Sequence, residues 1–147
     1  MEKLILTQVT FGTPEYDAMV DLRNKVLRIP LGMEFESNDL EKEYDQFHFA
    51  VEGFFSNELY GCLILKEINK DIVKMRQVAV HPGFQGQGIG LFLVERVERW
   101  VKANHYKKIE LSARDTAVSF YLKQEYHTTG EPFVEVGIPH LHMEKFI

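Results

Sequence analysis

The chain has 147 residues, of which 45% are hydrophobic and 27% are charged. This composition is typical of a folded globular protein and excludes a disordered or fibrous class, and the length fits a single domain over residues 1–147. The formal net charge of -5 argues against a nucleic-acid partner, because phosphate backbones bind clustered Lys and Arg.

The N-terminal segment and the cysteine content favour a cytoplasmic protein. The segment MEKLILTQVT lacks the long apolar region of a signal peptide, and no apolar segment reaches the roughly 18 residues of a membrane helix. The single cysteine, Cys62, lies in an apolar run and is expected to be a small buried side chain without an internal disulfide. We therefore expect no membrane partner.

The N-terminal third predicts a strand, a helix and a short second helix. Residues 4–9 form a short apolar run that indicates a strand. The following helix is expected to be capped by Thr13, to begin near Pro14 and to end at Pro30, with apolar residues at steps of three and four. The acidic stretch after Pro30 is expected to hold a short helix near residues 38–43.

The middle of the chain predicts three antiparallel strands and a long helix. The segments FHFAVEGFF and ELYGCLILKEI are rich in β-forming residues and form a hairpin around residues 56–57, which DIVKMRQVAV extends. A helix follows the next, glycine-rich stretch, with ion pairs expected between Glu95 and Arg99 and between Glu98 and Lys102. Its apolar stripe consists of Ile89, Leu93, Val97 and either Trp100 or Val101.

The C-terminal third completes a mixed α/β pattern. KKIELSA alternates as a strand, with Ile109, Leu111 and Ala113 on one face, and DTAVSFYLKQE predicts a helix capped at Asp115 or Thr116. Two more strands, YHTTGEPFVEV and HLHMEKF, are separated by the turn GIP. The whole order predicts a mixed α/β (α+β) fold with a central, mostly antiparallel sheet of about seven strands and about four helices.

Four glycines lie within eight residues of the stretch VAVHPGFQGQGIG, namely Gly83, Gly86, Gly88 and Gly90. Glycine is costly to order, so such a cluster predicts an unusual bend or the close approach of a ligand. The spacing matches neither a dinucleotide fingerprint nor a P-loop. What remains is glycine-rich backbone at the start of a helix, where free N–H groups and the helix dipole favour a phosphate. A tight turn without a ligand is the alternative.

The stretch QVAVHPGFQGQGIGLFLVE resembles the acetyl-CoA signature of the GNAT acyltransferase superfamily. The family pattern of Arg or Gln, two residues, Gly, one residue and Gly or Ala is matched by Gln85, Gly88 and Gly90, and V-x-V-x-P precedes it. The order of elements is similar to the family's fold over nearly the whole chain. The resemblance implies a single GNAT domain in which the fourth and fifth strands splay apart in a V around coenzyme A.

The resemblance also implies which residues hold acetyl-CoA. Main-chain amides from Gln85 to Gly90 would bind its pyrophosphate, and the backbone of the fourth strand would pair with its pantetheine arm. The Val78 N–H would polarise the thioester carbonyl, which stabilises charge that develops on oxygen in the transition state. The expected cofactor contacts are Val78, Ala79, Val80, Gln85, Gly86, Gln87, Gly88, Ile89, Gly90 and Tyr121.

Tyr121, Glu135 and His140 are the candidate catalytic residues. With Ala117, Tyr121 matches the family's A-x-x-x-Y element, in which a phenol resembles the general acid that returns a proton to the leaving thiolate. Packing alone is the alternative for Tyr121. Glu135 and His140 are alternatives for the general base, beside proton loss through water. The sequence departs from the family at Arg114, where Asn often stands, and this leaves one family contact to the cofactor open.

Further charged residues suggest a metal site and an acceptor pocket. An alternating strand face resembles a metal site but lacks a fourth ligand, so we predict no metal; its residues are His140, His142 and Glu144. Charged residues also flank the first helix, where GNAT proteins shape the acceptor pocket, and carboxylates facing the slot would favour a cationic amine. These residues are Arg23, Arg28, Glu34, Glu36 and Asp39.

Together these features predict an N-acetyltransferase in which a primary amine attacks the thioester of acetyl-CoA directly, after both reactants have been aligned. The alternatives are an acyl-CoA-sensing module without turnover and a structural domain whose glycine turn binds nothing. The acceptor is a small-molecule or peptide amine, and a homodimer is one possible assembly.

Overall fold

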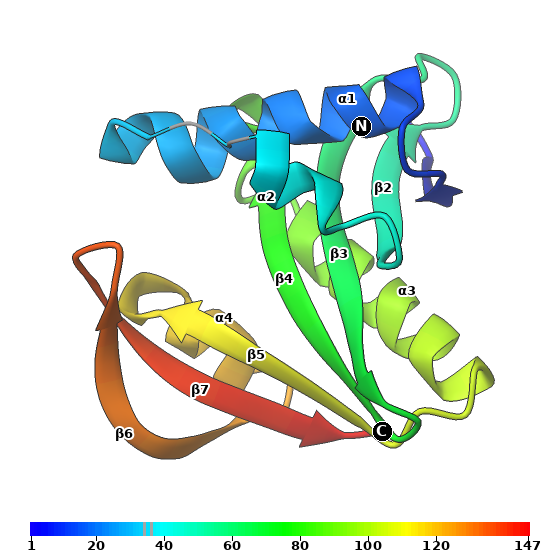
Figure 1. The fold of residues 1–147 in the computed structure, drawn as a ribbon. Helices are drawn as coiled ribbons and strands as arrows, with labels where there is room; N and C mark the ends of the chain where they lie inside the picture. Colours follow the sequence, from blue (N-terminus) through cyan, green and yellow to red (C-terminus); the bar gives the residue numbers. More distant parts are fainter. Residues whose placement is uncertain (34, 36) are drawn as a thin grey trace.

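The structure is a computed structural model that describes residues 1–33, 35 and 37–147 (Figure 1). Within these residues, seven strands form one sheet in the order β1-β2-β3-β4-β5-β7-β6. The strands are β1 (Leu4–Val9), β2 (Phe47–Gly53), β3 (Leu59–Asn69), β4 (Ile72–Val80), β5 (Lys108–Arg114), β6 (His127–Glu135) and β7 (Ile138–Phe146). The α-helices are α1 (Pro14–Arg23), α2 (Ser37–Glu41), α3 (Ile89–Ala103) and α4 (Val118–Leu122). The predicted mixed α/β fold is confirmed.

The sheet opens between β4 and β5. These two strands pair in parallel, with Ile72–Met75 joined to Lys108–Leu111, whereas the other neighbouring strands pair antiparallel. Beyond Met75 and Leu111 the two strands diverge, and Figure 1 shows β4 in green and β5 in yellow as the arms of a V. The predicted splay between the fourth and fifth strands is therefore confirmed.

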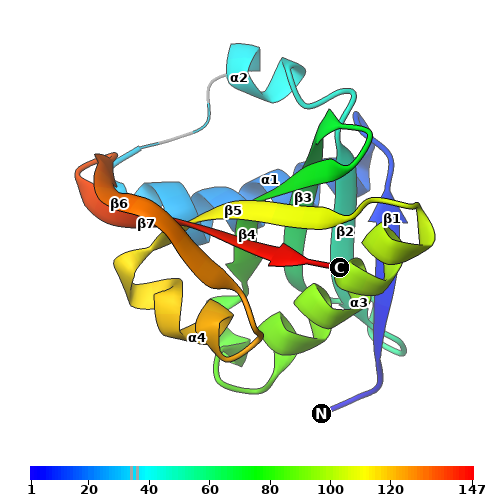
Figure 2. The same cartoon turned by 90° about the horizontal axis from the view of Figure 1, so that it is seen from below.

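Helices cover both faces of the sheet, and Figures 1 and 2 show α1 and α3 on opposite sides of β3 and β4. α1 buries Met19 and Leu22 against Cys62 and Ala79, so the lone thiol is buried and unpaired as predicted. α3 buries its apolar stripe in the larger core on the other face, which includes Leu63, Leu65, Val73 and Met75.

The stripe of α3 follows the predicted spacing, but both predicted ion pairs, Glu95–Arg99 and Glu98–Lys102, are wrong, since neither is among the ion pairs of the described residues. Ile89, Leu93, Val97 and Val101 are all buried, while Trp100 is half-buried. Glu98 instead accepts hydrogen bonds from Lys145 of β7 at 3.0 Å and from the Tyr126 hydroxyl at 2.8 Å. Its carboxylate faces the protein rather than its own helix surface, because these tertiary partners satisfy both of its oxygens.

The helix after Thr13 begins where predicted, but the α-helix ends before the predicted end at Pro30. The Thr13 hydroxyl accepts a hydrogen bond from the Tyr16 N–H, and Pro14 is the first helical residue. The α-helix ends at Arg23, after which the chain continues as a π-helical turn over 24–28 and a 3-10 turn over 29–31. Pro30 lies inside the 3-10 turn, where its missing N–H is tolerated. Gly32, with φ of 70°, follows that turn.

The predicted caps and turn near the C-terminus also need correction. A 3-10 turn over 115–117 precedes α4, so Asp115 and Thr116 do not cap the α-helix. The Asp115 carboxylate instead accepts from the N–H of its neighbour Thr116. The β6–β7 hairpin turns at Val136 and Gly137, both with positive φ, rather than at Gly-Ile-Pro. Such a pair of left-handed residues matches the right-handed twist of the strands in a two-residue hairpin loop.

Candidate active site

A β-bulge shapes the arm of β4 that borders the opening. Cys62 and Ile64 of β3 pair with Ala79 and Arg76 of β4, so β4 carries one more residue than its partner over this interval. Gln77 has a φ of 55°, which marks the bulge. Because a bulge bends its strand, it turns this end of β4 away from β5, as the family resemblance implied.

A cavity of about 330 Å³ occupies the opening. β4 and β5 form its walls, and the turn before α4, the tip of the β6–β7 hairpin and the helical segment after α1 close it. All three predicted catalytic residues, Tyr121, Glu135 and His140, line this cavity, together with the predicted cofactor contact Val78. The sequence therefore identified residues from four separate elements that the fold brings to one place.

The backbone from Gln85 to Gly90 has unused hydrogen-bond donors. In the described part of the chain, no acceptor receives a hydrogen bond from the N–H groups of these six residues. The preceding 3-10 turn uses the N–H groups of Gly83 and Phe84, and the first bonded N–H of α3 is that of Phe92, which donates to the Gly88 carbonyl. Free amides at a helix start are suited to an anion.

The glycines of this loop have two different roles. Gly86 and Gly88 have φ of 79° and 82°, and a Cβ at either position would meet nothing within 4 Å. Their backbone is left-handed, and the space beside them is open. Gly90 has an ordinary φ, but a Cβ there would lie 3.3 Å from the Phe120 ring. Gly90 thus allows α3 to pack closely against α4, while Gly86 and Gly88 shape the loop.

The Gln85 side chain contacts the protein's own backbone. Its Nε2 lies 3.4 Å from the Val80 carbonyl oxygen and donates to it. This bond ties the loop to the end of β4.

Tyr121 is buried, and its hydroxyl is free for a ligand. Burial raises the pKa of Tyr121 above its usual value of 10.0, so the phenol is protonated at neutral pH. The ring packs edge-on against Tyr126 at 5.5 Å between centroids, and the residue lines the cavity. Among the described residues the Tyr121 hydroxyl has no hydrogen-bond partner, whereas the Tyr126 hydroxyl donates to Glu98. Tyr121 can therefore donate a proton into the cavity.

His140 and Glu135 face each other near the tip of the β6–β7 hairpin. The His140 Nδ1 atom lies 2.7 Å from the Ile138 carbonyl oxygen, which can only accept, so we assign the ring proton to Nδ1. In the neutral ring, Nε2 then carries the lone pair, 3.8 Å from Oε2 of Glu135. A proton taken up at Nε2 would be stabilised by this carboxylate, so the arrangement suits a general base.

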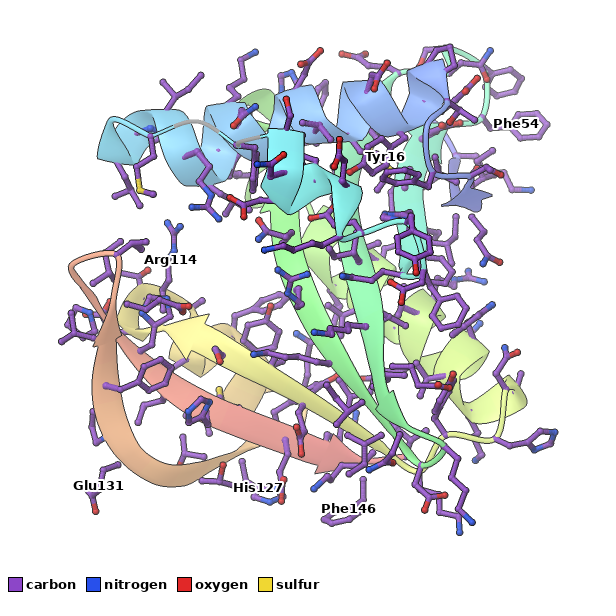
Figure 3. All side chains as sticks on the ribbon, in the orientation of Figure 1. Tyr16, Phe54, Arg114, His127, Glu131 and Phe146 are labelled. Carbon is purple, nitrogen blue, oxygen red and sulfur yellow. The ribbon has the colours of Figure 1, made fainter. Side chains whose placement is uncertain are left out.

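Arg114, at the position where the family often has Asn, contacts another part of the protein. Figure 3 shows its side chain pointing from the end of β5 toward the helical segment after α1. Its NH2 group donates to the Leu27 carbonyl at 3.1 Å. The contact joins the end of β5 to this helical segment at the rim of the cavity.

The charged residues flanking α1 lie in different places. Arg23 is fully buried and makes a two-point ion pair with Glu43, at 2.8 and 2.7 Å, instead of facing the cavity. Glu34 and Glu36 lie outside the described residues. Arg28 lines the cavity, and Asp39 lines a neighbouring hollow.

Two cavity residues were missed at the sequence level. Lys74 and Arg76 line the cavity from β4. The signal was present, because in DIVKMRQV these residues alternate with the buried Val73 and Met75 and so share the opposite face of the strand. They were overlooked because charged residues on a strand are usually just solvated.

The alternating face of β7 is used for other contacts. His142 Nδ1 lies 3.2 Å from the Ser112 hydroxyl, and Glu144 pairs with Lys108 at 3.0 Å and with His127 at 3.3 Å. Within the described residues, no three His, Cys, Asp or Glu side chains form a group that could hold a metal ion. That the protein uses no metal stays a prediction.

Comparison with known proteins places the chain among acetyltransferases. A family model described as an acetyltransferase (GNAT) domain matches residues 32–147. A curated Bacillus subtilis (strain 168) protein that bears the name acetyltransferase is 32% identical over 72 residues, so the match spans 49% of this chain and 49% of that relative. YyaT from the same organism is 28% identical over 132 residues, which is 84% of this chain and 88% of YyaT.

Solved structures share the fold over almost the whole chain. An acyl-CoA N-acyltransferase from Pseudomonas aeruginosa has a TM-score of 0.82 and 21% identity, covering 97% of this chain and 99% of that one. A GNAT family acetyltransferase from Elizabethkingia anophelis, solved with acetyl-CoA bound, has a TM-score of 0.74 and 21% identity, with both chains fully covered. Identities at this level establish the shared fold.

None of the helices described in the structure combines the length and the apolar character needed to cross a membrane.

Proposed function

Because the chain belongs to the GNAT acetyltransferase family, we propose that it transfers the acetyl group of acetyl-CoA directly to a primary amine. Family membership confirms the predicted enzyme class, an acyltransferase, and its predicted co-substrate, acetyl-CoA. The identity of the amine and the direct attack are the proposed part. One observation supports them most: three candidate catalytic side chains line one cavity beside β4, and the loop from Gln85 to Gly90 that follows this strand has a row of free amides.

The free amides from Gln85 to Gly90 are proposed to bind the pyrophosphate of acetyl-CoA. Each phosphate oxygen would accept from N–H groups that have no other partner, at the positive end of α3. The pantetheine arm would then lie in the V along Val78, Ala79 and Val80, where the bulge separates β4 from β5. This places the thioester near the Val78 N–H, which would polarise its carbonyl.

The chemistry that we propose needs one proton acceptor and one proton donor. The protonated amine loses one proton to Nε2 of His140, directly or through water, and Glu135 stabilises the resulting charge. The neutral amine nitrogen attacks the thioester carbonyl carbon and then loses a second proton to solvent, the carbon–sulfur bond breaks, and the sulfur leaves as a thiolate. Tyr121 gives that thiolate its proton and regains one from solvent. Cys62 has no part, because it is buried in the sheet core and burial raises the pKa of its thiol to about 12.

The proposal is tested by two measurements on the same protein. Acetyl-CoA at about 100 times its dissociation constant should stabilise the fold by roughly 2.7 kcal/mol, seen as a rise in melting temperature. A thiol-release assay with acetyl-CoA and a broad panel of primary amines should then show turnover that requires the amine. Stabilisation without turnover for any amine would support the sensing module instead, and no stabilisation would support the empty turn.

Other expectations from the sequence stay predictions. They are a single domain over residues 1–147, a cytoplasmic location, a homodimeric assembly and the lack of a nucleic-acid partner. None of them enters the mechanism above.

A further inference from the structure

The cavity has a strongly positive wall although the chain as a whole is acidic. The formal net charge of the protein is -5, yet among the described residues four cationic side chains line the cavity against one carboxylate, that of Glu135. The four cations are Arg28, Lys74, Arg76 and Arg114. Glu135 lies beside His140 and acts on Arg76 through its charge, but one carboxylate cannot balance four cations.

The cations gather on the side of the cavity that faces α1. Lys74 and Arg76 lie on one face of β4, Arg28 lies in the helical segment above them, and Arg114 reaches that segment from β5. Arg28 packs over the Phe35 ring at 4.5 Å. The positive groups therefore come from three elements and surround one part of the opening, away from the free amides at the start of α3.

Arg76 carries a charge that the described protein does not neutralise. Its NH1 group donates to the Gln46 side chain at 2.9 Å, which is a neutral partner. In the described part of the chain, no Asp or Glu oxygen lies within 4.0 Å of Lys74, Arg76 or Arg114. Burial lowers the pKa of Arg76, with Arg23 and Arg28 adding to this effect and Glu43 opposing it. Arg76 stays protonated at neutral pH, so a counter-anion would relieve its desolvation.

We propose that the amine acceptor carries a negatively charged group, a carboxylate or a phosphate, which Arg76 and Lys74 bind while the amine faces His140. The inference rests on the proposed function, since it identifies the chemical class of the acceptor at the same site. It adds an anionic group to the cationic amine that the sequence suggested. Arg28 and Arg114 line the same cavity and add to its positive charge.

The test uses matched pairs of amine probes: the acid of each pair carries an anionic group, and its neutral partner has an uncharged amide or hydroxyl in place of that group. β-Alanine is compared with β-alaninamide, and O-phosphoethanolamine with ethanolamine, each added to the full chain saturated with coenzyme A. Coenzyme A fills the amides of the α3 loop, so a phosphate probe cannot bind there. The acid of a pair should raise the melting temperature at millimolar concentration, and its neutral partner should not. The two pairs separate a carboxylate preference from a phosphate preference.

Variants of cavity residues test whether the acid raises the melting temperature by binding in the cavity. Arg76→Gln should abolish the shift that the acid produces, whereas Arg76→Lys should keep part of it. Lys102→Gln removes an equal charge from an exposed position on α3 and should change nothing. If a probe is also acetylated, Arg76→Gln should raise KM for the acid at least tenfold with less than a twofold change for the neutral partner.

Three outcomes would overturn the inference: equal shifts from acid and neutral probes, no shift from any probe, or a shift that survives Arg76→Gln and Lys74→Gln combined. The proposed function is judged separately, by thiol release across the amine panel. If the protein binds acids at Arg76 but acetylates no amine, the anion site is supported and the proposed reaction is contradicted.

Discussion

Nε2 of His140 lies 3.8 Å from Oε2 of Glu135, while Nδ1 of the same ring is held at 2.7 Å by the Ile138 carbonyl. This geometry predicts that His140→Asn lowers kcat by about 100-fold or more, the usual contribution of a general base. Asn is the chosen replacement because its amide can still donate to the Ile138 carbonyl. The measurement is the initial rate of thiol release with an active amine.

A neighbouring histidine provides the matched control for this variant. His142 lies on the same face of β7 but contacts Ser112 and does not line the cavity, so His142→Asn should leave kcat within about twofold of the unmodified protein. Glu135→Gln should lower kcat less than His140→Asn, because Glu135 only stabilises the proton that His140 accepts. Equal rates for His140→Asn and His142→Asn would remove His140 from the mechanism.

Replacing Tyr by Phe should have opposite effects at two neighbouring tyrosines, lowering the rate at one and the stability at the other. Tyr121→Phe removes a hydroxyl without a partner in the described chain, so the melting temperature should hardly change while kcat falls by about 100-fold or more. Tyr126→Phe removes the hydroxyl that donates to Glu98 at 2.8 Å. It should lower the free energy of unfolding by about 1 to 3 kcal/mol and leave kcat nearly unchanged.

The two readouts separate catalysis from packing. Acetyl-CoA should still stabilise Tyr121→Phe as much as the unmodified protein, which a ligand-induced melting shift would show. A loss of that shift together with the rate would mean that Tyr121 supports the cofactor site rather than proton transfer.

The glycine loop offers a third test with an internal control. Gly88 and Gly12 have nearly the same φ, 82° and 80°, and a Cβ at either would meet nothing within 4 Å. Replacement by Ala should therefore destabilise both by a similar amount, about 1 to 2 kcal/mol. Gly88→Ala should in addition weaken acetyl-CoA binding at least tenfold, since its Cβ and altered backbone would disturb the amides that face the phosphate. Calorimetric titration of both variants with coenzyme A measures the difference, and equal affinities would contradict a phosphate site at this loop.

Most of the fold followed from local patterns in the sequence. The period of two in KKIELSA placed Ile109, Leu111 and Ala113 on the buried face of β5, and the stripe of α3 placed Val97 and Val101 in the core. The glycine spacing pointed to the strand-to-helix junction at which the free amides lie, while the anion site itself stays a prediction. These features depend on residues only a few positions apart, so their spacing in the sequence is enough to predict them.

Beside the local errors at a helix end, a cap and a turn, two errors concern contacts between distant parts of the chain. Glu98 was assigned to Lys102 one turn away but binds Lys145, 47 residues along the chain, because the fold directs its carboxylate inward. Arg23 was placed near the acceptor but pairs with Glu43, which the sequence shows only as one member of an acidic stretch. The local sequence does not show whether a charged side chain contacts a buried partner or water. For the same reason, the position of Arg76 in the cavity could not be predicted.

The buried cluster beside α1 predicts how stability depends on pH. Burial by itself would raise the pKa of Glu43, but the hydrogen bonds and charge of Arg23 outweigh it and lower that pKa below the usual 4.5. Burial lowers the pKa of His48, whose Nε2 lies 3.0 Å from the Glu43 carbonyl oxygen, below the usual 6.5. In both groups the unfolded chain binds protons more readily than the folded one, so stability falls as pH falls. The loss should begin below about pH 6.5 through His48 and steepen below about pH 4.5 through Glu43.

Urea denaturation at several pH values, with variants of each group, checks this prediction. His48→Gln should flatten the curve between about pH 6.5 and 4.5, whereas His105→Asn, at an exposed position with φ of 69°, should leave it unchanged because Asn tolerates that backbone. Glu43→Gln should lower stability at neutral pH by about 3 to 5 kcal/mol, since it leaves the buried Arg23 charge without its partner. The same variant should lose the steep acid limb, because the group that takes up the proton is gone. An unfolding free energy that stays constant from pH 7 to pH 4 would show that neither group is perturbed by the cluster, and the ion pair would then be too loosely held to position α1 over the sheet.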